Sequence, residues 1–87
     1  MATTQADIRE WINEASEDTR WMIVVADTFD YEDYPVYVAD DEKKFWEAFD
    51  AHNEAMQRIM EVYDLDMDVE PQLKEFRANH WPARSLP

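Results

Sequence analysis

Acidic residues spaced two apart are the clearest candidates for chemistry in this sequence. Asp64, Asp66 and Asp68 alternate with apolar residues, and Glu75 follows them. If Asp64 is position one, these acids fall at positions one, three, five and twelve of an EF-hand-like calcium loop. Position six of such a loop needs glycine for its sharp turn, but Val69 stands there. The competing interpretation is a solvated acidic linker between two helices.

A second group of acids is interleaved with aromatic residues in the middle of the chain. Its members are Asp27, Asp30, Glu32 and Asp33, with the aromatics Phe29, Tyr31 and Tyr34. Paired carboxylates hold Mg²⁺ or act as general acid and base, but no His, Lys or Ser lies among these acids. Aromatic side chains framed by carboxylates suit the binding of an Arg-rich surface. In the alternative interpretation, the aromatics fold back onto the core.

The composition excludes several other kinds of site. Cysteine is absent, so the chain has no disulfide, thiol nucleophile or thiolate metal site. Glycine is absent too, which excludes the Gly-rich loops that hold phosphates. His52 and His80 lack the spacing of zinc ligands, and we expect His52 to be a hydrogen-bonded residue at the edge of the core. The prediction is a protein with no cofactor and no enzymatic activity.

The charge of the chain is strongly one-sided. Twenty-one acids against eight bases give a net charge of −13, and residues 27–42 and 61–70 contain no base. Nucleic acid and anionic membranes are therefore poor partners, whereas basic proteins are favoured. No apolar run approaches the ~20 residues of a membrane span, and the N-terminus lacks the pattern of a signal peptide. We expect a cytoplasmic protein.

The stretch from Trp21 to Ala39 has the strongest β-propensity and organises the predicted fold. It holds two apolar runs joined by the acidic aromatic connection, which predicts an antiparallel hairpin with strands near 20–26 and 35–39. The first strand is apolar on both faces and therefore needs cover on both sides. Pro35 cannot donate to a ladder, so it suits the start of a strand or an edge.

Helices are predicted on both sides of this hairpin. Thr4 and Asp7 resemble a capping box for a helix over about 5–17. A long second helix, capped by Asp40 or Asp41, is predicted to run to residue 63. Its apolar stripe recurs in steps of three and four and should face the hairpin. The stripe consists of Phe45, Phe49, His52, Met56, Ile59, Met60 and Tyr63.

The C-terminal part of the chain predicts one more helix and a tail. Pro71 suits the first position of the third helix, with Glu70 as its cap. Residues 82–87 should form a loose tail unless Trp81 docks. The whole chain, residues 1–87, is therefore predicted to be a single α+β domain in which three α-helices pack on a two-stranded antiparallel β-hairpin.

Two segments of the chain carry a resemblance. The runs DTFDYEDYPVYV at Asp27–Val38 and MQRIMEVYDLDMD at Met56–Asp68 resemble a family of short, acidic, functionally uncharacterised bacterial and phage proteins. In composition and size the chain is similar to phage anti-CRISPR and DNA-mimic inhibitors. This resemblance implies an inhibitor of a basic, nucleic-acid-handling partner. Mimicry would be partial, because a duplex of ~30 Å shows about 18 phosphates and the charge here covers the whole surface.

These observations predict a non-enzymatic acidic binding protein whose two acidic tracts form one recognition surface. The predicted partner-binding residues are Asp27, Asp30, Tyr31, Glu32, Asp33, Tyr34, Asp64, Asp66 and Asp68. Two alternatives stay open. One is a calcium- or metal-responsive domain that uses Asp64, Asp66, Asp68 and Glu75. The other is a structural module that forms a homodimer through exposed aromatics.

Overall fold

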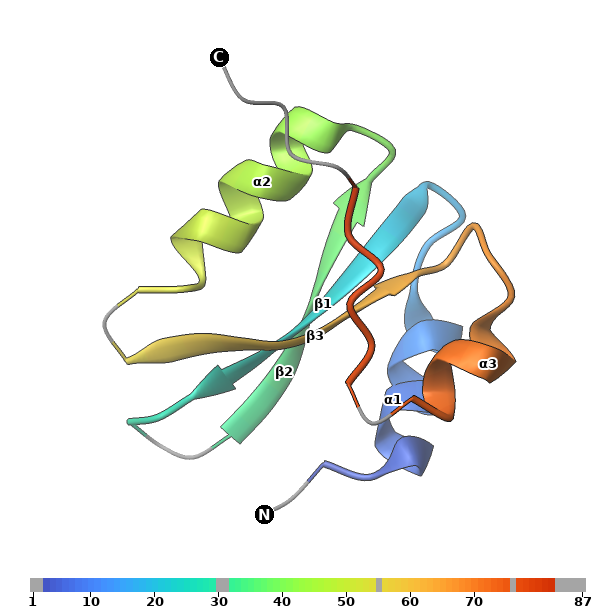
Figure 1. The fold of residues 1–87 in the computed structure, drawn as a ribbon, viewed down its shortest axis with the longest axis horizontal. Helices are drawn as coiled ribbons and strands as arrows, with labels where there is room; N and C mark the ends of the chain where they lie inside the picture. The colour runs from blue at the N-terminus through green and yellow to red at the C-terminus, as the bar shows by residue number, and fades with distance from the viewer. Residues whose placement is uncertain (1–2, 30–31, 55, 76, 83–87) are drawn as a thin grey trace.

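A three-stranded antiparallel sheet lies at the centre of the molecule (Figure 1). The computed structural model describes residues 3–29, 32–54, 56–75 and 77–82. The elements are α1 (Gln5–Glu14), β1 (Thr19–Asp27), β2 (Glu32–Ala39), α2 (Glu42–Ala51), β3 (Gln57–Asp64) and α3 (Val69–Leu73). The strand order is β2-β1-β3, and β1 pairs antiparallel with both neighbours. The predicted α+β class is confirmed, but the two-stranded sheet is wrong because β3 is a third strand.

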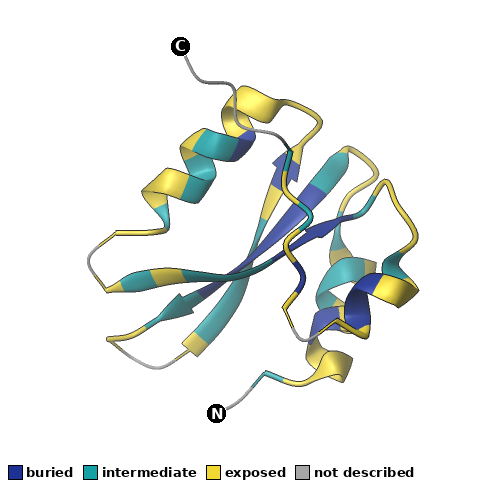
Figure 2. Cartoon of the chain, viewed as in Figure 1, coloured by how far each residue is buried: buried dark blue, intermediate teal, exposed yellow. Residues whose placement is uncertain are grey.

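The central strand β1 separates two apolar cores, as its sequence predicts. All five residues from Trp21 to Val25 are buried (Figure 2). Trp21, Ile23 and Val25 contact α2 through the buried Phe45. On the opposite face, the core contains residues of α1 and α3. Its buried members are Ile8, Met22, Val24, Tyr63, Leu73 and Ala78. The sheet is therefore the middle layer of three, with α2 on one side and α1 with α3 on the other.

The caps of the helices explain where each one begins. Thr4 and Asp7 form the predicted capping box, but α1 ends at Glu14, before the predicted residue 17. Of the two predicted caps for α2, Asp41 accepts the N–H of Lys44. α3 is capped by Asp68 rather than by Glu70, so it begins earlier than the predicted start at Pro71. Proline is tolerated there because the first helical turn needs no N–H donor.

The predicted long second helix is wrong. α2 ends at Ala51, with His52 as its cap, and the chain re-enters the sheet as β3. Phe45 is fully buried and Phe49 packs against the same cluster, as the stripe predicts. The later members of the stripe belong to a strand, and Met56 is exposed.

A β-bulge in β3 explains why the strand has the spacing of a helix. The register between β1 and β3 shifts at Met60, which is an extra residue on β3. The extra residue places Ile59 and Val62 together on the α2 face, and Met60 and Tyr63 together on the opposite face. Each pair is three residues apart. The bulged strand therefore reproduces the steps of an amphipathic helix.

The C-terminal segment, residues 77–82, runs alongside β3. The N–H of Val62 donates to Ala78 O at 2.8 Å, and the N–H of His80 donates to Val62 O at 3.0 Å. Trp81 docks on α2, with its ring centroid 5.9 Å from that of Phe49. Of the predicted tail, residues 83–87 lie outside the described residues. Within the described ranges, no helix is long and apolar enough to cross a membrane.

Candidate functional site

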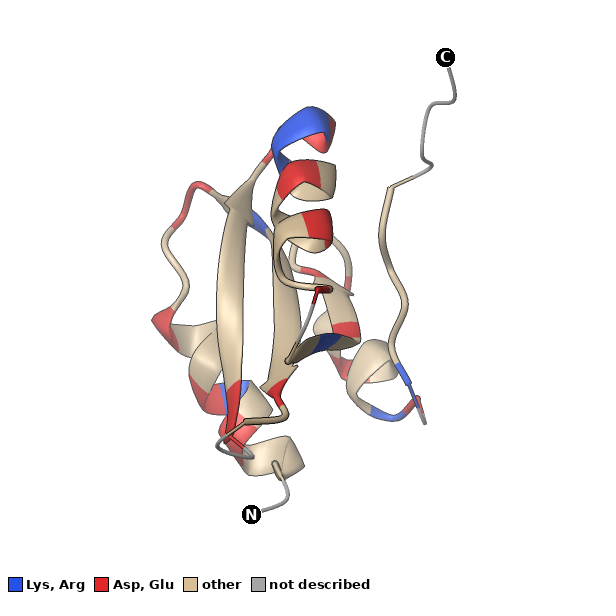
Figure 3. Ribbon diagram, turned by 90° about the vertical axis from the view of Figure 1, so that its left-hand side faces the viewer, with Lys and Arg blue, Asp and Glu red and all other residues tan. Residues whose placement is uncertain are grey.

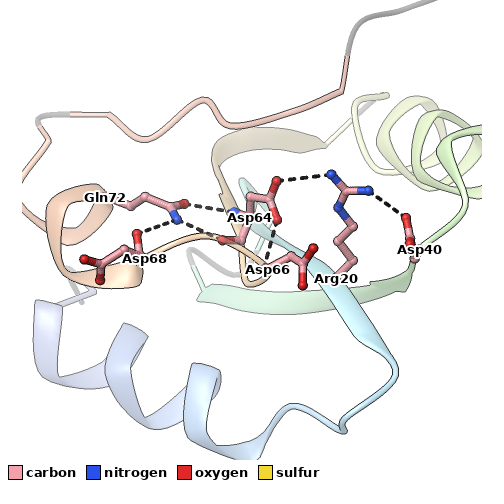
Figure 4. A network of polar contacts seen from close by, with 6 residues as sticks. All are labelled: Arg20, Asp40, Asp64, Asp66, Asp68 and Gln72. Atoms are coloured by element: carbon pink, nitrogen blue, oxygen red, sulfur yellow. Dashed lines mark hydrogen bonds and ion pairs between the residues drawn. The ribbon is translucent and has the colours of Figure 1, made fainter.

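The acidic loop after β3 is built into the fold. Asp64 is buried, and its Oδ1 accepts the N–H of Asp66 at 3.0 Å (Figure 4). Its Oδ2 lies 3.6 Å from the guanidinium of Arg20, which also pairs with Asp40 at 2.7 Å. The buried Gln72 amide accepts the backbone N–H of Asp64 at 2.9 Å. The carboxylate of Asp64 therefore holds the loop in place and is not presented to a partner.

The geometry of this loop does not support the calcium alternative. Asp68 is engaged as the cap of α3, where its Oδ1 accepts the N–H of Glu70. Glu75 lies beyond the end of α3, and its carboxylate pairs with His80 at 2.9 Å. Among the described residues, no group of three or more His, Asp or Glu side chains could hold a metal ion. Asp66, which is exposed, is left without converging ligands.

The hairpin between β1 and β2 places its acids in different environments. Asp27 and Glu32 pair across the end of the hairpin. Asp33 accepts a hydrogen bond from the hydroxyl of Thr3 and thereby joins β2 to the N-terminal segment. The predicted binding residues Asp30 and Tyr31 lie outside the described residues.

Tyr34 is part of the core edge rather than of an exposed loop. Its hydroxyl lies 3.1 Å from His52 Nδ1 and accepts a hydrogen bond from Gln57 Nε2 at 2.6 Å. Its ring packs against the cluster beneath α2. The predicted role of His52 as a hydrogen-bonded core-edge residue is thereby confirmed, and Tyr34 contributes to the fold rather than to a free aromatic surface.

The predicted binding residues of the hairpin lie at the opposite end of the sheet from Asp64, although Asp40 of the first acidic tract lies near Asp64 and pairs with the same Arg20. Asp64 pairs with Trp21 at the start of β1, whereas Glu32 pairs with Asp27 at its end. At ~3.3 Å per residue, these ends are roughly 20 Å apart. Figure 3 shows acidic residues at both ends of the strands and on the helices. The structure therefore separates Asp27 and Glu32 from Asp64, and of the first tract it brings Asp40 near Asp64.

Two large apolar side chains are exposed together at the hairpin end. Phe29 is 74% exposed and Met56, just before β3, is 53% exposed. Both line a shallow open hollow, which we call the hairpin-tip hollow. Its lining residues are Asp27, Phe29, Ala51, Glu54, Met56 and Gln57. The hollow therefore combines an apolar surface with two carboxylates.

Hydrogen bonds hold the two apolar residues of the hollow in place. Asp27 Oδ1 accepts the backbone N–H of Phe29 at 2.8 Å. Thr28 donates to the carbonyl of Met56 twice, from its N–H at 2.6 Å and from its hydroxyl at 2.8 Å. The backbone that carries these exposed side chains is thus fixed, which lowers the entropy cost of binding.

The sequence predicts two of the six lining residues of this hollow. Phe29 and Asp27 belong to the predicted acidic aromatic group. The sequence does not predict Met56 and Glu54 as site residues, because it places both in the long second helix. Only the position of β3 next to β1 brings Met56 to the hairpin. No local signal in the sequence marks Met56 as exposed, because its position fits the predicted helical stripe.

No family model, curated protein or solved structure matches this chain. Its function is therefore inferred from its own surface chemistry. Within the described structure, the hairpin-tip hollow joins exposed apolar side chains to unpaired carboxylates on a fixed backbone. That combination suits the contact of a basic, partly apolar group.

Proposed function

We propose that this protein is a non-enzymatic acidic binding protein that docks a basic protein at the hairpin-tip hollow. The observation that carries the proposal is the exposure of Phe29 and Met56 side by side on a hydrogen-bonded backbone. Large exposed apolar groups rimmed by polar residues are typical of protein-binding sites. The net charge of −13 would steer a basic partner towards the molecule.

The partner class that we propose is a basic, nucleic-acid-handling protein in the cytoplasm, which this protein would inhibit. The excess of acids supports this class. Acids at both ends of the sheet would repel nucleic acid and attract the basic surfaces that normally bind it. Competition with nucleic acid would then follow from charge, without imitation of a full duplex.

Affinity capture with matched variants tests the proposal. The wild-type protein, a Phe29→Ala/Met56→Ala double variant and a Met67→Ala control serve as baits in a bacterial lysate. Met67 is 55% exposed, so it matches Met56 in exposure, but it lies in the loop after β3. We expect basic proteins to be retained by the wild type and by the control, and to be lost from the double variant.

Two further measurements distinguish a loss of specific binding from misfolding and from nonspecific adsorption. All three baits should melt within a few degrees of one another, because exposed substitutions change stability by about 0.5 kcal/mol or less. Retention should weaken as salt is raised, since charge attraction is screened. Equal retention by the wild type and the double variant would overturn the proposal that this hollow is the binding site.

A further inference from the structure

We infer that the hairpin-tip hollow receives an arginine side chain of the partner, in preference to lysine. This inference rests on the proposed function and names the chemistry of the docked group. The hollow offers the ring of Phe29, the thioether of Met56 and the carboxylates of Asp27 and Glu54. An arginine carries a planar cation on an apolar stem, so it matches a site that is both apolar and acidic.

The carboxylates of the hollow have capacity to accept hydrogen bonds. Asp27 uses Oδ1 for the N–H of Phe29, and its Oδ2 has no hydrogen bond within the described structure. The carboxylate of Glu54 has no ion pair within the described structure. Arg58 lines an adjacent hollow together with Glu54, but the two side chains are not within salt-bridge distance. A guanidinium presents several N–H donors in one plane and can bond to two carboxylates while it lies on a ring.

The chain itself contains this arrangement at the other end of the sheet. The guanidinium carbon of Arg20 lies 4.4 Å from the ring centroid of Trp21. The same guanidinium pairs with Asp40 at 2.7 Å and with Asp64 at 3.6 Å. An aromatic ring and two carboxylates therefore hold an arginine there. The hairpin-tip hollow offers the same three groups: the exposed ring of Phe29, the exposed carboxylate of Glu54 and the partly buried carboxylate of Asp27.

Methionine methyl NMR tests this inference with a control inside the same molecule. Protein with ¹³C-labelled methionine methyl groups is titrated with a tetra-arginine peptide and with a tetra-lysine peptide at equal charge and constant salt. We expect tetra-arginine to shift the Met56 methyl signal and to leave Met67, which lies between Asp66 and Asp68, nearly unchanged. Tetra-lysine should bind at least about fivefold more weakly, because ammonium lacks the planar fork.

Substitutions in the hollow show which side chains produce the preference for arginine over lysine. Phe29→Ala removes the ring and keeps the charge, so the arginine and lysine peptides should bind about equally. Glu54→Gln should weaken both peptides. Asp27→Asn keeps an oxygen for the N–H of Phe29 and removes one charge, so it separates charge from loop geometry.

Three results would overturn the arginine inference. Equal affinity of the two peptides, with the shift confined to Met56, overturns the arginine preference and leaves the proposed function standing. Equal shifts at Met56 and Met67 show general charge attraction and overturn the inference as well. If Met56 does not respond while the captured proteins still depend on Phe29, the partner uses another group, and only the inference fails.

Discussion

Tyr63 shows how a single buried hydroxyl connects the sheet to the C-terminal segment. Its hydroxyl donates to Glu61 Oε2 at 3.0 Å, and the same oxygen accepts the N–H of Ala78 at 3.1 Å. Burial raises the pKa of Tyr63 well above its usual value, and the hydrogen bond to Glu61 adds to the effect. The neutral phenol is therefore the form that the folded protein stabilises.

This raised pKa predicts a loss of stability at alkaline pH. In the unfolded chain Tyr63 ionises near pH 10, whereas the folded chain resists ionisation. The contribution of Tyr63 is therefore complete below about pH 10 and is lost as the pH rises towards the higher pKa of the folded state. Urea unfolding at a series of pH values should show the free energy of unfolding falling above about pH 10.

Tyr63→Phe should flatten this alkaline fall. At neutral pH the variant should lose about 0.5–1.5 kcal/mol, since one hydrogen bond is removed while Glu61 keeps the N–H of Ala78. Tyr37→Phe is the control, because the pKa of Tyr37 is also raised but its ring is partly exposed. A fall that is as steep in the Tyr63 variant as in the wild type would contradict the assignment.

At the scale of the elements, the sequence predicts the regions with an unambiguous local signal. The capping box of Thr4 and Asp7, the hairpin and the start of α2 at Asp41 all follow from short patterns. The end of α2 does not. A helix C-terminus is commonly marked by glycine, and this chain has none. Together with the bulge at Met60, the missing marker makes a helix, a turn and a strand look like one long helix.

The candidate site was predictable to the same extent. Phe29 and Asp27 lie on a hairpin that the sequence predicts, so their position near its tip could be predicted. Glu54 and Met56 reach the site only through the pairing of β3 with β1, which is a contact between distant parts of the chain. Periodicity within a window reports the local pattern and carries no information on such pairing.

Deletion of Met60 tests the bulge. Ile59 and Glu61 already pair with neighbouring residues of β1, so the deletion should leave the register unchanged and make the ladder regular. We expect a folded protein that loses about 1–3 kcal/mol of stability, because the packing of a partly buried methionine is lost. Urea unfolding, with the amide NMR spectrum as a check on the fold, measures both.

The control for the Met60 deletion is a variant with one residue inserted in β1, at a position without a bulge. One alanine inserted between Ile23 and Val24 of β1 should turn the following side chains to the wrong faces, and this protein should not fold. If deleting Met60 were as damaging as this insertion, residues 57–64 would not form the bulged strand described above.

At the scale of the whole molecule, charge repulsion opposes folding. The chain carries 21 acids against 8 bases and a net charge of −13. Acids therefore far outnumber the Lys and Arg side chains that could pair with them, and Figure 3 shows acids around the sheet. Compaction brings these like charges together, so screening should stabilise the folded state.

Raising NaCl from 10 mM to 500 mM should therefore raise the melting temperature. Each kcal/mol gained corresponds to about 4–8 °C for a domain of this size. Urea is the denaturant for the parallel equilibrium measurement because it carries no charge. A variant with Glu10→Gln, Glu14→Gln and Glu47→Gln should start from a higher melting temperature and respond less to salt. A salt response equal to that of the wild type would contradict the repulsion account.

The C-terminal segment has a consequence for how the protein is made. Ala78 completes the core beside α1, and Trp81 completes the cover over α2, yet both are among the last described residues to leave the ribosome. β1, which is apolar on both faces, emerges much earlier, and it stays uncovered until β3 and this segment have been synthesised. A nascent chain halted before residue 78 would expose the sheet to chaperones and proteases, whereas a chain in which residues 78–81 have emerged could cover both faces.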